Sequence, residues 1–212
     1  MERKEINSIP ELISQGAEAK IFLDKKKNLI IKNRLSKSYR LQELDKKIIK
    51  GRTKSEIKLL IKANQIINAP LPGKNTEENK IIMPYVKGKK LSDNLNNFSL
   101  EKQKEILEKI GKSIAILHKS DIIHGDLTTS NMILTKSNEV FFIDFGLGYI
   151  SKKIEDKAVD LHLLKQALEA KHFKNWEILF QKFKDAYSKN YFESKQIFER
   201  LIAVEKRGRY RH

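Results

Sequence analysis

Three oxygen-bearing side chains, Asp126, Asn131 and Asp144, have the types and the spacing needed to handle a phosphate chain. Asp126 and Asn131 lie in HGDLTTSN, and Asp144 opens DFG directly after the strand-like run VFFI. A carboxylate such as Asp126 can act as catalytic base by orienting an attacking hydroxyl or water, while Asn131 and Asp144 can hold Mg²⁺. Mg²⁺ prefers hard oxygen ligands and needs few of them, because it keeps several waters. Each residue alone fits an ordinary turn or cap, but the ordered set predicts Mg²⁺-dependent phosphoryl transfer.

Two residues upstream extend this set toward a nucleotide. Lys32 ends the apolar run LIIK, the position at which protein kinases carry the lysine that grips the α- and β-phosphates. Glu56, in the helical run RTKSEIKLL, is a candidate partner for that lysine. Alternatively, Lys32 is an ordinary surface lysine and Glu56 is a solvent-facing charge on the helix. With the downstream loop present, we expect Lys32 to be catalytic and ATP to be the cofactor.

The segment that would cover the phosphates is weak, because SQGAEAK has one glycine where a GxGxxG loop has three. Its small residues still let a hairpin approach phosphates closely, and it precedes Lys32 at a suitable distance. The run IIMPYVKG would offer backbone groups to the adenine edge, or it is simply a buried strand. The predicted nucleotide-binding set is Ile13, Gly16, Ala17, Glu18, Ala19, Lys32, Glu56, Met83, Pro84, Tyr85 and Val86.

The elements that must position these residues change in character along the chain. Short apolar runs at 10–15, 19–24 and 28–33 predict strands, a long amphipathic pattern follows, and 79–86 predicts another buried strand. A strong helix is expected from Ser99, two short strands lie around 131–144, and 153–205 is helical almost throughout. This order predicts an α+β chain with two lobes.

The charge favours a polyanionic partner. Lysine and arginine number 43 against 27 acidic residues, for a net charge of +16, although a lysine-coated soluble surface would give the same sign. The basic tail predicts contact with RNA or a partner through Lys206, Arg207, Arg209 and Arg211, or reach toward the nucleotide, unless it is merely a solvated terminus. The chain has no cysteine, no signal-like start and no long apolar run, so a cytoplasmic location is expected.

Several segments together resemble the small atypical serine/threonine kinase/ATPase family of the KEOPS complex, which is related to the RIO kinases. Besides HGDLTTSN, IDFG, GAEA and LIIK, the resemblance rests on KSYRLQELD, RTKSE and EKRGRYR. It covers nearly the whole chain and implies a minimal bilobal protein-kinase-like fold with a small β-rich N-lobe, one long helix region and a mostly helical C-lobe. The expected boundaries are an N-lobe at about 1–84, a hinge at about 85–90, a C-lobe at about 91–205 and a tail at 206–212.

The resemblance also implies an activity and partners. It implies ATP hydrolysis with weak serine/threonine phosphorylation, in support of threonylcarbamoyladenosine formation on tRNA. The partners would be the synthase subunit of the complex, a small further subunit on the N-lobe, and tRNA. In some archaea the synthase and this module are fused in one chain.

Two residues of the loop depart from the pattern of regulated kinases. Gly125 stands where those enzymes carry an arginine that receives an activation-loop phosphate, so such switching has no receptor here. Thr128 replaces a lysine that would neutralise the transferred phosphoryl group, a loss that typically slows the reaction about 100-fold or more. His124 and His118 are expected to be packing residues. We therefore expect slow turnover.

Two other functions remain open from the residues. Small-molecule phosphotransferases of the aminoglycoside or choline kinase type also use a His-Gly-Asp loop, but they normally add a large helical substrate domain. A non-catalytic scaffold that binds nucleotide and tRNA would also explain the charge. The intact Asp126, Asn131, Asp144 and Lys32 argue against a scaffold.

Overall fold

The computed structural model describes residues 9–74 and 77–209, and the chain divides into two compact units. Unit 1 comprises Met1–Ile61 and Pro70–Tyr85, and unit 2 comprises Lys62–Ala69 and Val86–His212. The mixed architecture confirms the predicted α+β, kinase-like fold class. In the described ranges, no helix is both long enough and apolar enough to cross a membrane.

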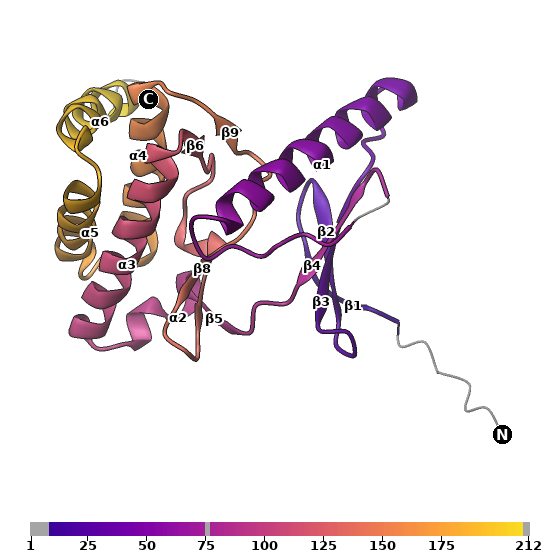
Figure 1. The fold of residues 1–212 in the computed structure, drawn as a ribbon, viewed down its shortest axis with the longest axis horizontal. Helices are drawn as coiled ribbons and strands as arrows, with labels where there is room; N and C mark the ends of the chain where they lie inside the picture. The colour runs from indigo at the N-terminus through magenta and orange to yellow at the C-terminus, as the bar shows by residue number, and fades with distance from the viewer. Residues whose placement is uncertain (1–8, 75–76, 210–212) are drawn as a thin grey trace. The chain divides into compact units, whose positions relative to one another are not determined.

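Unit 1 is built on an antiparallel sheet with the strand order β1-β2-β3-β4, visible in Figure 1. The strands are β1 (Glu11–Gln15), β2 (Ala19–Asp24), β3 (Leu29–Arg34) and β4 (Lys80–Pro84). Asn28 closes the β2–β3 turn with φ of 54°, a left-handed conformation that asparagine tolerates better than most residues. In this register, Lys32 lies opposite Ile21 on one side and Ile81 on the other.

The long helix α1 (Gln42–Asn64) runs through Gly51 without a break. Its buried positions recur at helical spacing and include Thr53, Glu56, Leu59, Leu60 and Ala63. A glutamate on this otherwise small and apolar stripe must find cationic partners, because an unpaired buried charge is costly.

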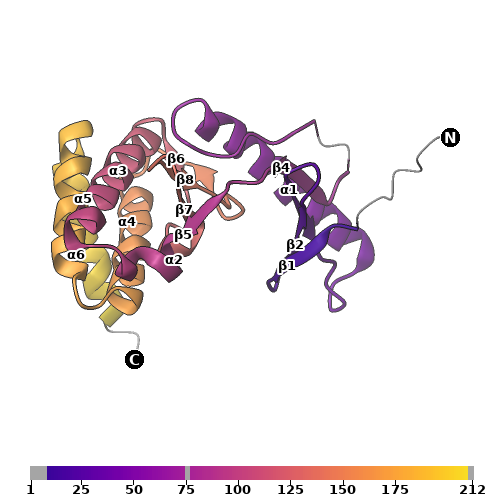
Figure 2. The same ribbon diagram turned by 90° about the horizontal axis from the view of Figure 1, so that it is seen from below.

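Unit 2 is mostly helical, and α3 and α5 lie side by side in both Figure 1 and Figure 2. Ser99 caps α3 by accepting a hydrogen bond from the backbone N–H of Lys102 at 3.3 Å. Gly111 permits the close approach of α5, since a Cβ there would lie 2.6 Å from the Phe183 carbonyl oxygen. The long helices are α3 (Leu100–Lys119), α4 (Ile154–Lys171), α5 (Trp176–Asn190) and α6 (Ser194–Arg209).

Short elements complete unit 2 around the loop 124–131. One sheet has the order β5-β7-β8, and β6 pairs with β9. The sequence did not predict the strands β5, β6 and β9, because runs of two or three residues are too short to show a period. Their bounds are β5 (Gly88–Lys90), β6 (Ile122–Ile123), β7 (Met132–Thr135), β8 (Val140–Phe142), β9 (Tyr149–Ile150), α2 (Leu91–Asn94), η1 (Leu95–Asn97) and η2 (Thr129–Asn131).

Candidate functional site

The first part of the candidate site is a buried ion cluster in unit 1. Lys32 Nζ lies 2.7 Å from Glu56 Oε1, and Arg34 Nη2 lies 2.5 Å from Glu56 Oε2. The three side chains are at most 7% exposed. The structure thus brings the predicted Lys32 and Glu56 together and adds Arg34, which sequence reasoning missed. Because Arg34 is two residues after Lys32 on one strand, alternation alone could have placed it on the same face.

The predicted phosphate-covering segment forms the β1–β2 connection. The Gly16 amide donates to the Ala19 carbonyl at 3.0 Å, while Lys37 Nζ donates to the Ala17 carbonyl. Glu18 accepts a hydrogen bond from Arg52 at 2.6 Å, and this bond holds the Glu18 pKa below its usual value. The carboxylate of Glu18 is therefore already engaged, so the backbone is what this turn can present to a ligand.

The residues predicted to contact adenine lie at and after the end of β4. Met83 is buried and pairs with Ile30 across the sheet, whereas Pro84 is exposed. The Tyr85 amide donates to the Asn28 carbonyl at 2.9 Å, which occupies one of the backbone groups expected to bind the base. Of the remaining predicted residues, Ile13 is half exposed on β1 and Val86 begins the second segment of unit 2.

The second part of the candidate site is the loop 124–131 in unit 2, where Asn131 clamps Asp126. Asn131 Nδ2 donates to the Asp126 carbonyl at 2.9 Å and to Asp126 Oδ2 at 2.8 Å. Both amide protons are therefore used on Asp126, and the Asn131 oxygen is the atom that this side chain can offer to a cation.

A backbone hydrogen bond places Asp144 near Asn131. The amide of Ile143, the residue before Asp144, donates to the Asn131 carbonyl oxygen at 2.9 Å. Asp144 adopts a left-handed φ of 62°, and its Oδ1 accepts the Gly146 amide at 3.1 Å. Aspartate adopts this conformation more readily than most non-glycine residues, and residues held in it are often found at functional sites.

A buried carboxylate that sequence reasoning missed supports this loop from behind. Asp160 Oδ2 accepts the backbone N–H of His124 at 2.8 Å, and Oδ1 accepts that of Gly125 at 3.0 Å. His124 is buried, with its ring 4.6 Å from that of Phe145, and its Nε2 lies 3.2 Å from the Ile143 carbonyl oxygen. The sequence did contain a signal for Asp160, namely an acidic residue among the apolar positions of α4, next to Leu161.

A buried histidine also contacts the loop. His172 Nε2 lies 3.1 Å from the Thr129 hydroxyl, and Nδ1 lies 2.7 Å from Asn96 Oδ1. Burial, with a smaller effect of the Lys171 charge, lowers the His172 pKa. The neutral ring can accept from Thr129 and donate to Asn96, so it satisfies both partners.

The predicted basic tail begins inside helix α6, which continues to Arg209. Lys206 is exposed, and Arg207 forms a 2.8 Å ion pair with Glu155 of α4. The side chain of Arg209 and all of Arg211 lie outside the described residues.

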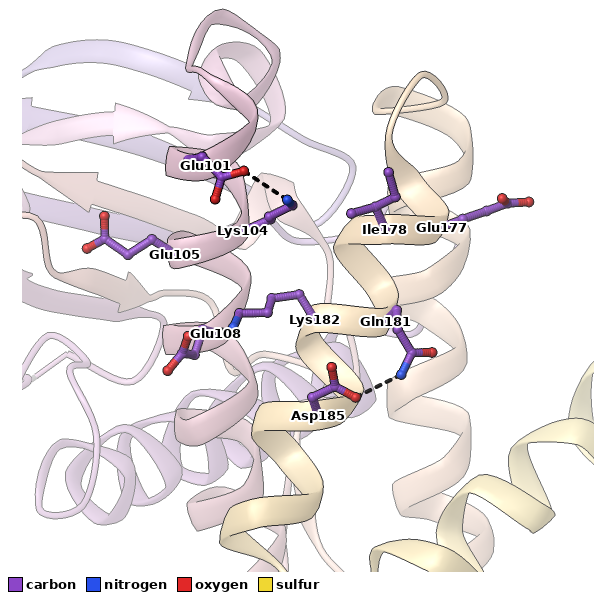
Figure 3. A pocket seen from close by; sticks show the side chains of 9 residues that line it. All are labelled: Glu101, Lys104, Glu105, Glu108, Glu177, Ile178, Gln181, Lys182 and Asp185. Carbon is purple, nitrogen blue, oxygen red and sulfur yellow. Dashed lines mark hydrogen bonds and ion pairs between the residues drawn. The ribbon is translucent and has the colours of Figure 1, made fainter.

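A groove of about 810 Å³ is lined by side chains of α3 and α5 (Figure 3). Its wall is rich in acidic side chains, but Lys104 pairs with Glu101 and Lys182 pairs with Glu108. These pairs involve two of the five carboxylates that line the groove, and none of its lining residues belongs to the candidate site. The lining residues are Glu101, Lys104, Glu105, Glu108, Glu177, Ile178, Gln181, Lys182 and Asp185.

The oxygen set of the loop, the buried lysine–glutamate pair and the two-unit fold together define a kinase-like class of protein. The RIO domain family matches residues 17–158, which is more than half of the chain. The chain therefore belongs to the RIO domain family.

The chain is also similar to curated proteins whose names are more specific than that of the family. The chain is 40% identical to KEOPS complex subunit Bud32 of Pyrococcus abyssi, over 95% of this chain and 96% of that protein. It is 41% identical to EKC/KEOPS complex subunit bud32 of Dictyostelium discoideum, over 96% of this chain and 84% of that protein. It is 39% identical to a probable bifunctional tRNA threonylcarbamoyladenosine biosynthesis protein of Methanobrevibacter smithii, over 95% of this chain but 37% of that protein. These matches confirm the resemblance inferred from the sequence motifs.

Proposed function

We propose that the chain is an ATP-dependent phosphotransferase that hydrolyses ATP and weakly phosphorylates serine and threonine. The observation that carries this proposal is the Asn131 clamp, in which one carboxamide orients Asp126 through two hydrogen bonds of 2.8 and 2.9 Å. Asp126 would serve as catalytic base by accepting a hydrogen bond from the attacking hydroxyl or water. Lys32, held by Glu56, would bind the α- and β-phosphates.

The described residues fit Mg²⁺ as the metal. Asn131 and Asp144 offer an amide oxygen and a carboxylate, and the described ranges contain no cluster of three His, Cys, Asp or Glu side chains that could hold a metal. Such a small set suits Mg²⁺, which keeps several waters and binds few protein ligands, whereas structural zinc would need more. When bound, Mg²⁺ would neutralise negative charge on the phosphates.

We propose slow turnover, because the loop lacks a cation that faster enzymes use: Thr128 cannot neutralise the transferred phosphoryl group. At Gly125 a side chain cannot be accommodated, so the loop also has no receptor for an activation-loop phosphate. A partner protein or RNA that supplies a cation would then raise the rate.

The relatives suggest the setting of this reaction. Two are named as subunits of a KEOPS complex, and a third as a bifunctional protein of tRNA threonylcarbamoyladenosine biosynthesis. We propose that this chain likewise acts in a KEOPS complex that modifies tRNA. Its partners would be the synthase subunit, a small subunit that binds unit 1, and tRNA, whose phosphates suit a net charge of +16.

The proposal is tested by replacing Asp144 with alanine and measuring Mg²⁺-dependent release of labelled phosphate from ATP. We expect turnover to be lost while the circular dichroism spectrum is retained. Asp185→Ala is the control, because Asp185 is an exposed aspartate on α5 outside the site. If Asp144→Ala hydrolyses ATP at the wild-type rate, the site assignment is wrong. If the wild-type protein shows no turnover with partner and tRNA present, the scaffold alternative is favoured.

A further inference from the structure

Behind the loop 124–131, a chain of three buried polar side chains joins three helices of unit 2. Tyr187 of α5 and His118 of α3 are fully buried, and Asp160 of α4 is 1% exposed. The Tyr187 hydroxyl lies 2.9 Å from His118 Nδ1, and His118 Nε2 lies 3.2 Å from Asp160 Oδ2. This hydrogen-bonded series reaches the loop, because Asp160 accepts hydrogen bonds from the backbone N–H groups of His124 and Gly125.

The direction of each hydrogen bond along this series of side chains follows from which atoms can donate and which can accept. An ionised Asp160 can only accept, so the proton of a neutral His118 must be on Nε2. Nδ1 is then an acceptor, and the Tyr187 hydroxyl must donate to it. The carboxylate of Asp160 therefore selects the histidine tautomer, and the tyrosine hydroxyl satisfies the other ring nitrogen and fixes the orientation of the ring.

We infer that the Tyr187 hydroxyl is a positioning group for Asp126, acting through His118 and Asp160. Asp160 fixes the two amides that directly precede Asp126, and Asn131 fixes its side chain. Without the hydroxyl, the buried Nδ1 lone pair of His118 has no donor facing it, so the ring is held on one side only. Its Nε2–H bond to Asp160, one of the three hydrogen bonds that the aspartate accepts, would then be held less firmly.

The test replaces Tyr187 with phenylalanine in the full chain. Long-range ¹H–¹⁵N spectra should place the proton of wild-type His118 on Nε2, and in the variant the Nδ1 resonance should move because this nitrogen loses its hydrogen-bond donor. Hydrogen exchange of the His124 and Gly125 amides should become faster. The effect on activity rests on the proposed function: kcat for ATP hydrolysis should fall about 10-fold, the lower range for removing a supporting partner, with KM for ATP little changed.

Tyr191→Phe is the matched control. The two tyrosine rings are neighbours with centroids 5.8 Å apart, but the Tyr191 hydroxyl contacts Lys157 and Glu193 instead. This control should leave the His118 Nδ1 resonance, the loop exchange rates and kcat unchanged. An equal loss in both variants would assign the effect to general packing and overturn the inference, as would unchanged loop exchange and kcat in Tyr187→Phe.

The outcomes separate this inference from the proposed function. If the wild-type protein has no ATPase activity, the proposed function fails, and the tautomer and exchange measurements still decide whether Tyr187 orders the loop. If Tyr187→Phe does not fold, the wild-type spectrum alone decides, because a proton on His118 Nδ1 contradicts the assigned direction of the chain.

Discussion

Gly125 is the position where a single methyl group should disturb the candidate site most directly. Its φ is +78°, and a Cβ placed there would lie 2.2 Å from the Leu147 carbonyl oxygen. The obstacle is backbone, so it cannot be relieved by a change of rotamer. The sequence suggested that an arginine is missing at this position, and the structure adds that the fold admits no side chain there at all.

The cost of Gly125→Ala can be estimated from these two features. The left-handed backbone costs an alanine about 1–2 kcal/mol relative to glycine. Forcing an extra carbon against the backbone of 147 costs a further 1–3 kcal/mol, approximately as overpacking does elsewhere. We therefore expect the free energy of unfolding to fall by about 2–5 kcal/mol. Activity should fall as well, because the Gly125 amide is one of the two held by Asp160.

Urea denaturation monitored by circular dichroism measures this change in the free energy of unfolding. Gly51→Ala is the control, for which we expect a change of the opposite sign. Gly51 lies inside α1, and a Cβ there meets nothing within 4 Å. Alanine at 51 should therefore stabilise the protein by about 0.5–1 kcal/mol. An unfolding free energy for Gly125→Ala within about 0.5 kcal/mol of wild type, the range of a neutral surface substitution, would refute the steric reasoning.

Three further predictions follow from other parts of the chain. Glu56→Ala should lower the free energy of unfolding by about 3–5 kcal/mol in urea titrations, because it removes the carboxylate that two buried cations share, and an unchanged midpoint would contradict the cluster. Replacing Lys206 and Arg207 with alanine should weaken tRNA binding and make the slope of log affinity against log salt less steep by about one to two units; an unchanged slope would exclude phosphate contacts there. Because the His172 pKa is lowered on folding, the unfolded state takes up its proton first, so stability should fall as pH drops below the ordinary value of 6.5. His172→Asn should remove that part of the pH dependence in unfolding titrations, and an identical pH profile would contradict the buried neutral ring.

The fold class was readable from the sequence because its elements have clear periods. The strands at β2 and β3 and the helix α3 follow alternation, helical spacing and a serine cap. Continuity of α1 through Gly51 was less clear, since a glycine inside a helix weakens the local preference, and tertiary packing of its buried stripe decides the outcome.

Candidate reacting residues could also be proposed from the sequence, because phosphoryl transfer restricts which residue types can serve. Asp126, Asn131, Asp144, Lys32 and Glu56 were predicted from type and order, and the structure joins Lys32 to Glu56 and Asn131 to Asp126. Their roles in catalysis stay predictions until turnover is measured.

The supports of these residues were decided only in three dimensions. Arg34, Asp160 and His118 are ordinary residues in the sequence, and only the fold places Arg34 on Glu56, Asp160 on the loop amides and His118 on Asp160. The physical reason is that buried charges and amides must be satisfied by whatever group packs nearest, and partners up to 42 residues apart carry no shared local pattern. The sequence alone determined which chemistry is available; the tertiary structure determined which side chains hold it in place.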